Sequence, residues 1–578
     1  MAFQLSPGVA VVEKDFSAIV PAVSTSAGAF AGVFAWGPVL DPVTITSENT
    51  LIQRFGKPTD SNFDSFFTAA NFLSYTNNLL VVRVDTDNAK NAVTTGTAVK
   101  INNFDDYNTN YSNGEGSVGE WAAKYPGALG NSLKVSMADQ TTFSGWDYEA
   151  EFDSAPSTSS YADSVGGSND EIHVIVIDED GLWTGTQGAI LEKFAYVSKA
   201  SDAKKADGTN NYYKNVINSQ SKYIWWMDHT SSVATSVNGS GTSGVAWGTA
   251  AANVGFKDLT GAVSKSLADG VDDLSATDGQ LEDGFALFAN AEQYDISLIP
   301  LGKVSETVAT YVINNVAEVR LDCVVFASPQ YIVDNTTGGT DGDTIQGAAV
   351  SDMIDATNEY RNALPSTSYA VLDSGAKYQY DRYNDKYRWV PLNGDVAGLA
   401  ARTDYTNDPW WSPAGLNRGQ IKNVVKLAVN PGKTERDNLY KNGVNPVVNF
   451  PGQGTVLYGD KTLQSRPSAF DRINVRRLFI VLEKAIATAA KYQLFEFNDN
   501  FTRAQFKNLV EPFLRDVQGR RGVTDFRVVC DDTNNTGEII DRNEFVADIY
   551  VKPNRSINFI TLNFIAARSS VKFEEIGA

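Results

Sequence analysis

A glycine-rich segment that ends at residue 462 has the residue types of a phosphate-binding loop. Gly454 and Gly459 are followed by Asp460, Lys461 and Thr462. Such a loop needs the lysine directly after the second glycine, so that backbone N–H groups and the ammonium group reach one phosphate together. Here Asp460 lies between them and brings negative charge toward that phosphate. The spacing therefore argues against a nucleotide site.

Other residues that could do chemistry lack the neighbours or the spacing that a known site needs. His173 and His229 are the only histidines, and neither has a cysteine nearby, which excludes a His/Cys metal site. No Gly-x-Ser-x-Gly elbow occurs, so a hydrolase triad has no nucleophile. Asp334, Asp341 and Asp343 lack EF-hand spacing.

The glycines at 239, 241 and 244 have dinucleotide-loop spacing, but the residues before them are too polar for a buried strand. A flexible loop is favoured there. We therefore predict no catalytic site, no cofactor and no metal, and a protein that is not an enzyme.

The elements around these residues predict a mixed α/β chain. Short apolar strands alternate with helices over residues 29–84 and again over 296–327, so we expect the two pieces to share one sheet across an insertion. The insertion, residues 88–284, is rich in Asn, Ser, Thr, Gly and Asp. Its apolar runs are strand-like, and its polar loops are typical of a solvated surface.

The C-terminal third contains two amphipathic helical patterns. An apolar stripe runs from Leu478 to Ala489, with Arg476 and Arg477 largely off it. A second stripe runs from residue 506 to 517. Such stripes indicate helices that pack on a sheet or on each other.

The start of the second helix has its own signals. Thr502 and Gln505 are expected to form a capping box, with Phe501 packed on Phe506. Pro512 should kink the helix.

Both ends of the chain favour extended structure. Val9, Val11 and Val12 are β-favouring, and residues 557–565 read as a strand that is apolar on both faces, followed by a charged extension. Terminal strands of this kind invite pairing with another chain.

The charge is unevenly distributed. Residues 395–578 carry 25 basic and 21 acidic side chains, a net charge of +4, whereas the other 394 residues carry 23 basic and 48 acidic side chains, a net charge of −25. A soluble acidic protein explains the second part but not the first, which an interface with an acidic partner would explain. Nucleic acid is disfavoured as a partner, because most of the chain would repel phosphate.

Composition also bears on the compartment. No apolar run is long enough for a membrane span, and the N-terminus lacks a signal-peptide pattern, so we expect no membrane insertion. Cys323 and Cys530 each lie in an apolar run, which favours buried thiols and assembly in a cytoplasm.

Several segments, taken in order, resemble the contractile tail sheath proteins of myoviruses. The most characteristic lie at 445–463 (NPVVNFPGQGTVLYGDKTL) and 474–479 (NVRRLF). Others are AARTD at 400–404, PWWSPAG at 409–415, FEFN at 495–498, SPGV at 6–9, GVFAWGP at 32–38 and VVRV at 81–84.

The resemblance implies a multidomain mixed α/β fold with discontinuous domains. Residues 1–20 would be an N-terminal arm that joins the inner domain, and residues 21–87 and 285–394 would form a middle α/β domain. Residues 88–284 would be an outer, β-rich, surface-exposed insertion domain. Residues 395–578 would form the inner C-terminal α/β domain with a C-terminal arm.

The implied function is structural. Subunits of such a sheath form hexameric rings that stack helically around an inner tail tube and contract to drive the tube through the host envelope. The expected partners are other copies, the inner tube protein, and baseplate and tail terminator proteins, in a virion assembled in the host cytoplasm. One alternative is a sheath subunit of a bacterial contractile injection or secretion apparatus. Another is a carbohydrate-active or adhesive virion protein, suggested by aromatic residues such as Trp225 and Trp226.

The resemblance also implies contact residues. The family's terminal arms donate strands to neighbouring subunits, and here Val9, Val11, Val12, Val571 and Phe573 would do so. Arg520 and Arg521 follow the second helix between two glycines. Either they complement the negative end of that helix, or they also bind acidic groups on the inner tube.

Overall fold

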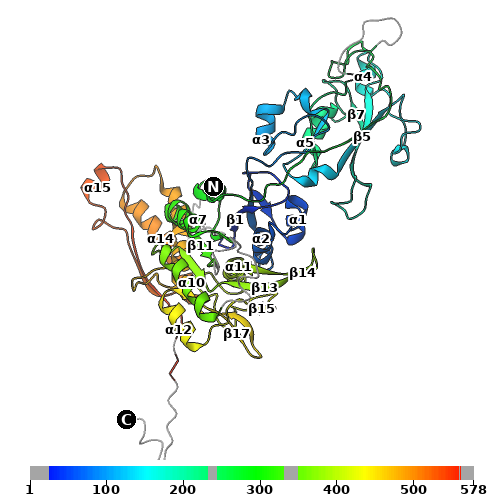
Figure 1. Ribbon diagram of the computed structural model, residues 1–578. Helices are drawn as coiled ribbons and strands as arrows, with labels where there is room; N and C mark the ends of the chain where they lie inside the picture. The colour runs from blue at the N-terminus through cyan, green and yellow to red at the C-terminus, as the bar shows by residue number, and fades with distance from the viewer. Residues whose placement is uncertain (1–24, 232, 234–243, 331–348, 559, 562–578) are drawn as a thin grey trace, which may run out of the picture.

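The computed structural model describes residues 25–231, 233, 244–330, 349–558 and 560–561, and it has two lobes (Figure 1). The larger lobe contains both ends of the described chain. The smaller lobe, which carries α4, α5 and β5–β7, projects from the larger one.

A seven-stranded sheet forms the centre of the larger lobe. All neighbouring strands are parallel except β2, which pairs antiparallel with β3. The pairing of Gly28 with Leu298 joins strands from before and after the insertion, which confirms that the two pieces share one sheet. The strand order is β16 (Val444–Asn445), β12 (Ala370–Asp373), β11 (Val324–Ala327), β10 (Leu298–Pro300), β1 (Gly28–Val33), β3 (Leu79–Val84) and β2 (Val43–Ile45).

Helices cover both faces of this sheet, so its strands are buried on both sides. Ala29 and Ala31 face one core and Phe30 faces the other, as strand alternation requires. The first core includes α6 (Asp278–Ala286), α7 (Glu306–Val312), α10 (Val350–Ala363) and α12 (Lys433–Lys441), and the second includes α1 (Glu48–Phe55), α2 (Phe63–Leu73), α11 (Asn393–Thr406) and α13 (Ile473–Ala490).

Two local details of this lobe bear on the sequence patterns. Ser47 caps α1 through a hydrogen bond from the Thr50 N–H, as its position predicts. Between the strands of 296–327, residues 306–320 form one continuous helical run, in which α7 passes through a π-helical turn (Ile313–Ala317) into α8 (Glu318–Arg320). Two smaller sheets lie beside the central one: β13 (Ala376–Asp381) with β14 (Lys386–Pro391) and β15 (Lys426–Leu427), and the hairpin of β17 (Val447–Phe450) and β18 (Gly454–Leu457).

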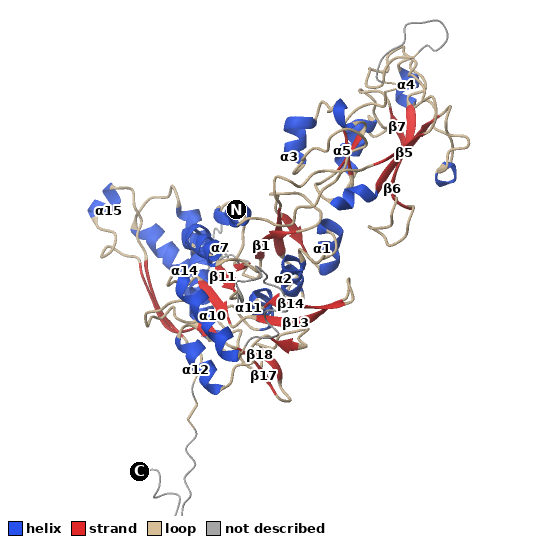
Figure 2. Cartoon of the chain, in the orientation of Figure 1, coloured by secondary structure: helices blue, strands red, loops and turns tan. Residues whose placement is uncertain are grey.

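The smaller lobe has its own antiparallel sheet, set apart from the central one (Figure 2). Trp225 and Trp226 are buried in this lobe, so they offer no aromatic surface for an adhesive function. Tyr107 stacks on Trp225, which gives part of residues 88–120 a small core of its own. The sheet runs β7 (Ala189–Ser198), β6 (Glu171–Asp178), β5 (Leu133–Asp139) and β9 (Val263–Ser266), and beside it lie β4 (Trp121–Ala123), β8 (Ile224–Trp226), α3 (Phe104–Asp106), α4 (Ser160–Ser164) and α5 (Tyr213–Gln220).

The C-terminal residues form a helical hairpin packed on two strands. Both apolar stripes are buried between α13, α14 (Asn500–Gly519), β19 (Val523–Val529) and β20 (Asp548–Pro553), with α15 (Gly537–Asp541) between the strands. The helix cap differs from the expected one. Asp499 caps α14 by accepting a hydrogen bond from the Thr502 N–H, and Phe501 is exposed, because the helix begins three residues before the expected box.

Arg476 and Arg477, which lie largely off the apolar stripe, are nevertheless buried. One further expectation for this region is not met by the described residues. Ile557 and Ile560 are exposed and lie in no strand, so the described part of residues 557–565 does not form the strand expected from its apolar pattern.

Candidate functional site

The glycine-rich segment does not form a phosphate loop. Gly454 begins β18, which pairs with β17, and the Asp460 carboxylate is buried and paired with Arg472 (3.1 Å). The Lys461 ammonium group donates to the backbone carbonyl of Tyr440 (2.6 Å). Both charged groups that a phosphate would meet are therefore already engaged.

The remaining candidates for chemistry are packing residues where they are described. His173 stacks on Phe152, accepts a hydrogen bond from the Tyr196 N–H and contacts the Ser154 carbonyl. Cys323 and Cys530 are free and buried, and burial raises the pKa of the Cys323 thiol to about 12. Asp334, Asp341, Asp343 and the glycines at 239 and 241 lie outside the described residues.

Within the described ranges, no group of three or more His, Cys, Asp or Glu side chains is placed to hold a metal ion. The helices of the same ranges include none with the length and apolar character needed to cross a membrane.

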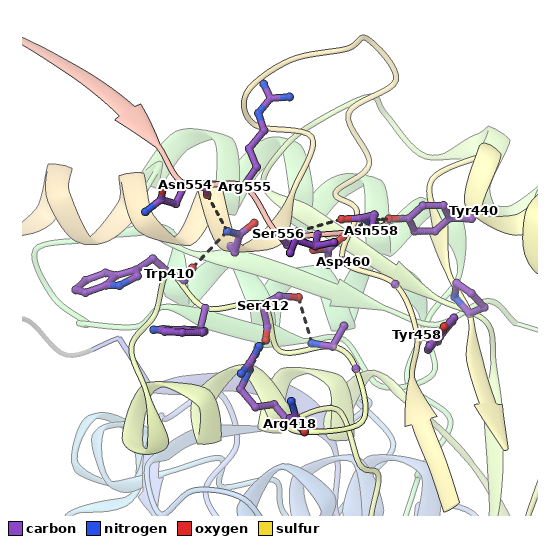
Figure 3. Close-up of a pocket in the computed structure, with 18 of the residues that line it drawn as sticks. Trp410, Ser412, Arg418, Tyr440, Tyr458, Asp460, Asn554, Arg555, Ser556 and Asn558 are labelled. Atoms are coloured by element: carbon purple, nitrogen blue, oxygen red, sulfur yellow. Dashed lines mark hydrogen bonds between the residues drawn. The ribbon is translucent and has the colours of Figure 1, made fainter. Parts of the chain in front are cut away.

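A pocket of about 960 Å³ lies where several loops of the larger lobe meet (Figure 3). One wall holds Trp410 and Trp411, which follow α11. The opposite wall holds Tyr440 on α12 and Tyr458 after β18, and the segment after β20 passes beside both. Its cationic side chains are Lys433, Arg418, Arg436, Arg521 and Arg555, and none of them forms an ion pair with a described residue.

Asp460 fixes the segment that leaves β20 at the edge of this pocket. Its carboxylate accepts hydrogen bonds from Ser556 (2.5 Å) and Asn558 (3.2 Å) and pairs with Arg472 at the start of α13. Burial, and then the Asp460 charge, raises the pKa of Tyr440 to about 12, so its hydroxyl remains neutral. The C-terminal segment is thus tied to the first turn of α13.

A second buried ion pair fixes the other end of the described chain. The Arg477 guanidinium donates to the Asp404 carboxylate (2.6 Å), to the Ala400 carbonyl (2.9 Å) and to the Thr25 carbonyl (3.2 Å). The Thr25 hydroxyl donates to the same Asp404 oxygen (2.6 Å). Burial raises the pKa of the Asp404 carboxyl. Both described ends of the chain therefore leave the lobe close to the first turns of α13.

The hairpin of β19 and β20 has two open edges. Among the described strands, each pairs only with the other. Val9, Val11, Val12, Val571 and Phe573, the residues expected to exchange strands, lie outside the described residues.

Arg520 and Arg521 have different surroundings. Arg520 pairs with Asp408, lies 3.6 Å from Asp516 and sits over the Trp410 ring. Arg521 is exposed at the pocket rim, over the Trp411 ring and without an ion pair to a described residue. Arg520 is therefore held within its own subunit, whereas the Arg521 charge faces outward.

Comparison with known families places three matches along the chain. Residues 275–463 match the phage tail sheath protein central domain, and residues 465–567 match the phage tail sheath C-terminal domain. Residues 28–84 match the N-terminal region of domain III of the tail sheath protein Gp18.

Similar proteins match almost the whole chain. A tail sheath protein of Vibrio phage KVP40 is 37% identical over 676 residues, covering 99% of both chains, and one of Enterobacteria phage T4 is 34% identical over 672 residues with the same coverage. These alignments are longer than this chain of 578 residues, so the relatives carry insertions that it lacks.

Solved structures share the fold at low sequence identity. A sheath tail protein from Listeria innocua has a TM-score of 0.53 at 11% identity, covering 92% of this chain and 96% of the other. One from Desulfitobacterium hafniense has a TM-score of 0.51 at 12% identity, covering 95% and 100%.

Proposed function

This chain belongs to the phage tail sheath family, and on that premise we propose how its subunits assemble and move. It is a structural protein of a contractile phage tail and hence a virion component. The observation that carries this conclusion is the match of 99% of the chain to a phage tail sheath protein at 37% identity. The subunits polymerise in stacked hexameric rings around an inner tube, between a baseplate and a terminator, after synthesis in the host cytoplasm.

Imaging of the purified chain tests polymerisation. Negative-stain images should show helical tubes of uniform diameter, with or without added tube protein. A chain that stays monomeric at every concentration tried would contradict the proposal. A bacterial injection apparatus remains the alternative setting, but the relatives at 32–37% identity are all phage proteins.

We propose a domain layout that the two lobes support. We place residues 88–284 outermost, residues 21–87 and 285–394 in the middle, and residues 395–578 with the 1–20 arm innermost. The last two regions are closely joined, because α11 (Asn393–Thr406) crosses their boundary and β16 extends the central sheet. A gold-labelled tag inserted after Ala206, in an exposed turn, should mark the outer surface of the tubes.

The terminal arms carry the connection between subunits. The open edges of β19 and β20 can each accept a strand, since unpaired backbone groups at a sheet edge bind extended segments. Strands from residues 9–12 and 571–573 of neighbouring subunits would fill them. During contraction these strands act as hinges while the subunits turn as near-rigid bodies. The extended sheath is a kinetically trapped state that needs no nucleotide.

The inner tube is contacted by the basic turn at Arg520 and Arg521. Exposed charge pairs contribute about 0–1 kcal/mol each, which suits a contact that contraction must break at every subunit. Arg521 is the better candidate of the two, because Arg520 already pairs with Asp408.

We expect Arg521→Glu to weaken assembly on tubes while leaving the fold and empty sheaths unchanged. Arg520→Glu should instead lower the melting temperature, because it places a carboxylate beside Asp408. Co-sedimentation with tubes measures the first effect, and wild-type association should also fall between ~50 mM and ~500 mM salt as the Debye length shortens. Wild-type tube binding by Arg521→Glu would assign both arginines to the end of α14 alone.

A further inference from the structure

A cluster of exposed apolar side chains lies at the tip of the α13–α14 hairpin, and the contacts proposed above do not use it. Phe495 is fully exposed (106%) and Phe497 nearly so (83%), and Tyr492, Leu494 and Phe501 are exposed beside them. Apolar patches of this kind on a soluble protein mark sites of interaction.

One end of the tip is anchored to neighbouring elements. Phe495 has a φ of 72°, a backbone conformation that bulky residues rarely adopt. Three residues further on, the Asn498 amide donates to the Glu544 carbonyl (2.7 Å) and the Asn498 oxygen accepts from Arg503 (3.0 Å). Asp499 then caps α14. A segment anchored at one end loses less conformational entropy on binding than a free one.

The pocket of Figure 3 lies at the other end of the same hairpin. Asn474 in the first turn of α13 and Arg521 just after α14 both line it. The 18 residues of α13 span about 27 Å at 1.5 Å per residue, so the tip cannot fill the pocket of its own subunit. A contact between two different surfaces of identical subunits does not have to close on itself, and it can build an open helix.

The tip and the pocket are complementary in chemistry. Glu496 is exposed between the two phenylalanines and has no ion pair within the described residues. Arg418 and Arg436 in the pocket are half-buried and have no carboxylate partner within the same ranges, and burial lowers the pKa of Arg418. Tyr440 and Tyr458 supply aromatic surface on one wall of the pocket (Figure 3). The Arg436 guanidinium lies over the Tyr458 ring.

We propose that the tip (Phe495, Glu496 and Phe497) of one subunit docks in this pocket of a second copy. Glu496 pairs there with Arg418 and Arg436, whose guanidinium groups donate to the Ser412 and Pro431 carbonyls but have no carboxylate partner among the described residues. The phenylalanines pack on Tyr440 and Tyr458. The contact rests on the proposed function for its partner, since it needs identical subunits that polymerise. It is separate from strand exchange at β19 and β20 and adds a second, side-chain contact between subunits.

Charge reversal with rescue tests the pairing. Glu496→Arg and Arg436→Glu should each raise the concentration needed for polymerisation by ~10-fold or more, and the double variant should recover most of the loss. Phe495→Ser with Phe497→Ser should impair polymerisation in the same way, whereas Phe104→Ser, an exposed phenylalanine in the other lobe, should not. The variants at residues 104, 495, 496 and 497 should melt like the wild type, because these side chains are exposed. Arg436 is half-buried, so recovery of polymerisation in the double variant is what separates its pairing with Glu496 from a local packing effect. Single variants that polymerise like the wild type would overturn the docking.

Cysteine cross-linking separates this proposal from the proposed function. Glu496→Cys with Arg436→Cys should give disulfide-linked ladders under mild oxidation, and neither single variant should, since both native thiols are buried. Ordered tubes without ladders would leave the proposed function standing and overturn the docking. If the wild type forms no tubes, the proposed function fails. In that case the docking is tested by the cysteine pair at high protein concentration, and absence of a cross-linked dimer there overturns it. Cross-links from residue 496 to the tube protein would assign the tip to the tube instead.

Discussion

Deletion of residues 1–14 or of residues 567–578 is expected to give a folded monomer that no longer polymerises. The described cores, the Asp404–Arg477 pair at Thr25 and the Asp460 contacts to Ser556 and Asn558 all remain in both truncated chains. Under the proposed strand exchange, each truncation removes a segment that would pair with the edge of β19 or β20 in a neighbouring subunit. Circular dichroism should therefore match the wild type, while sedimentation and negative-stain images should show no tubes.

Point variants with a matched control sharpen this test. Val571 and Phe573 lie two residues apart, so in a strand they share one face, whereas Lys572 and Glu574 share the other. Val571→Ser with Phe573→Ser should reduce polymerisation strongly, and Lys572→Ala with Glu574→Ala should reduce it little. Normal-length sheaths from either truncation would contradict strand exchange, and equal losses from both double variants would place the contact elsewhere in the arm.

The central sheet could be predicted from the sequence because its signals are local. Apolar strands alternate with helices on both sides of the insertion, and a capping serine at position 47 marks the start of α1. What local patterns could not give was the exact helix start at Asp499, because Thr502 with Gln505 forms an equally plausible box. The strand expected at residues 557–565 failed for a similar reason. An apolar pattern on both faces says that a strand must be covered, but it does not say whether the residues that cover it belong to the same chain. In this chain Ile557 and Ile560 are exposed.

The side-chain clusters of the larger lobe could not be predicted, because their members are distant in sequence. The sequence shows only that Arg477 lies off an apolar stripe, and its partner Asp404 is 73 positions earlier in the chain. In the sequence, Asp460 only interrupts the spacing of a phosphate loop. In the structure its carboxylate pairs with Arg472 and accepts a hydrogen bond from Ser556. The FEFN segment at 495–498 belongs to the resemblance, but only the structure shows that it is exposed and that the pocket lies at the other end of the same hairpin.

Breaking the Asp404–Arg477 pair is expected to cost more stability than any other single change considered for this chain. Both side chains are almost completely buried, and removing one leaves the other charged and desolvated. Such losses amount to about 3–5 kcal/mol, so Arg477→Ala or Asp404→Ala should lower the free energy of unfolding of the larger lobe by that amount. Urea unfolding followed by tryptophan fluorescence measures it, with Arg542→Ala at the exposed Arg542–Glu544 pair as the control that should change little.

A graded series then tests whether this pair serves as the anchor of the N-terminal arm. Thr25→Val removes only the hydroxyl donor and should cost about 0.5–1.5 kcal/mol, and Arg477→Met with Asp404→Leu should cost much less than the sum of the single changes. If the pair also transmits force from the arm to α13, the Met/Leu variant should fold and form sheaths that break at lower shear than the wild type, because a charged, geometrically fixed contact to Thr25 has been lost. Single variants no less stable than the Arg542 control would show that the pair is solvated, and wild-type shear resistance in the Met/Leu variant would show that the arm is anchored elsewhere.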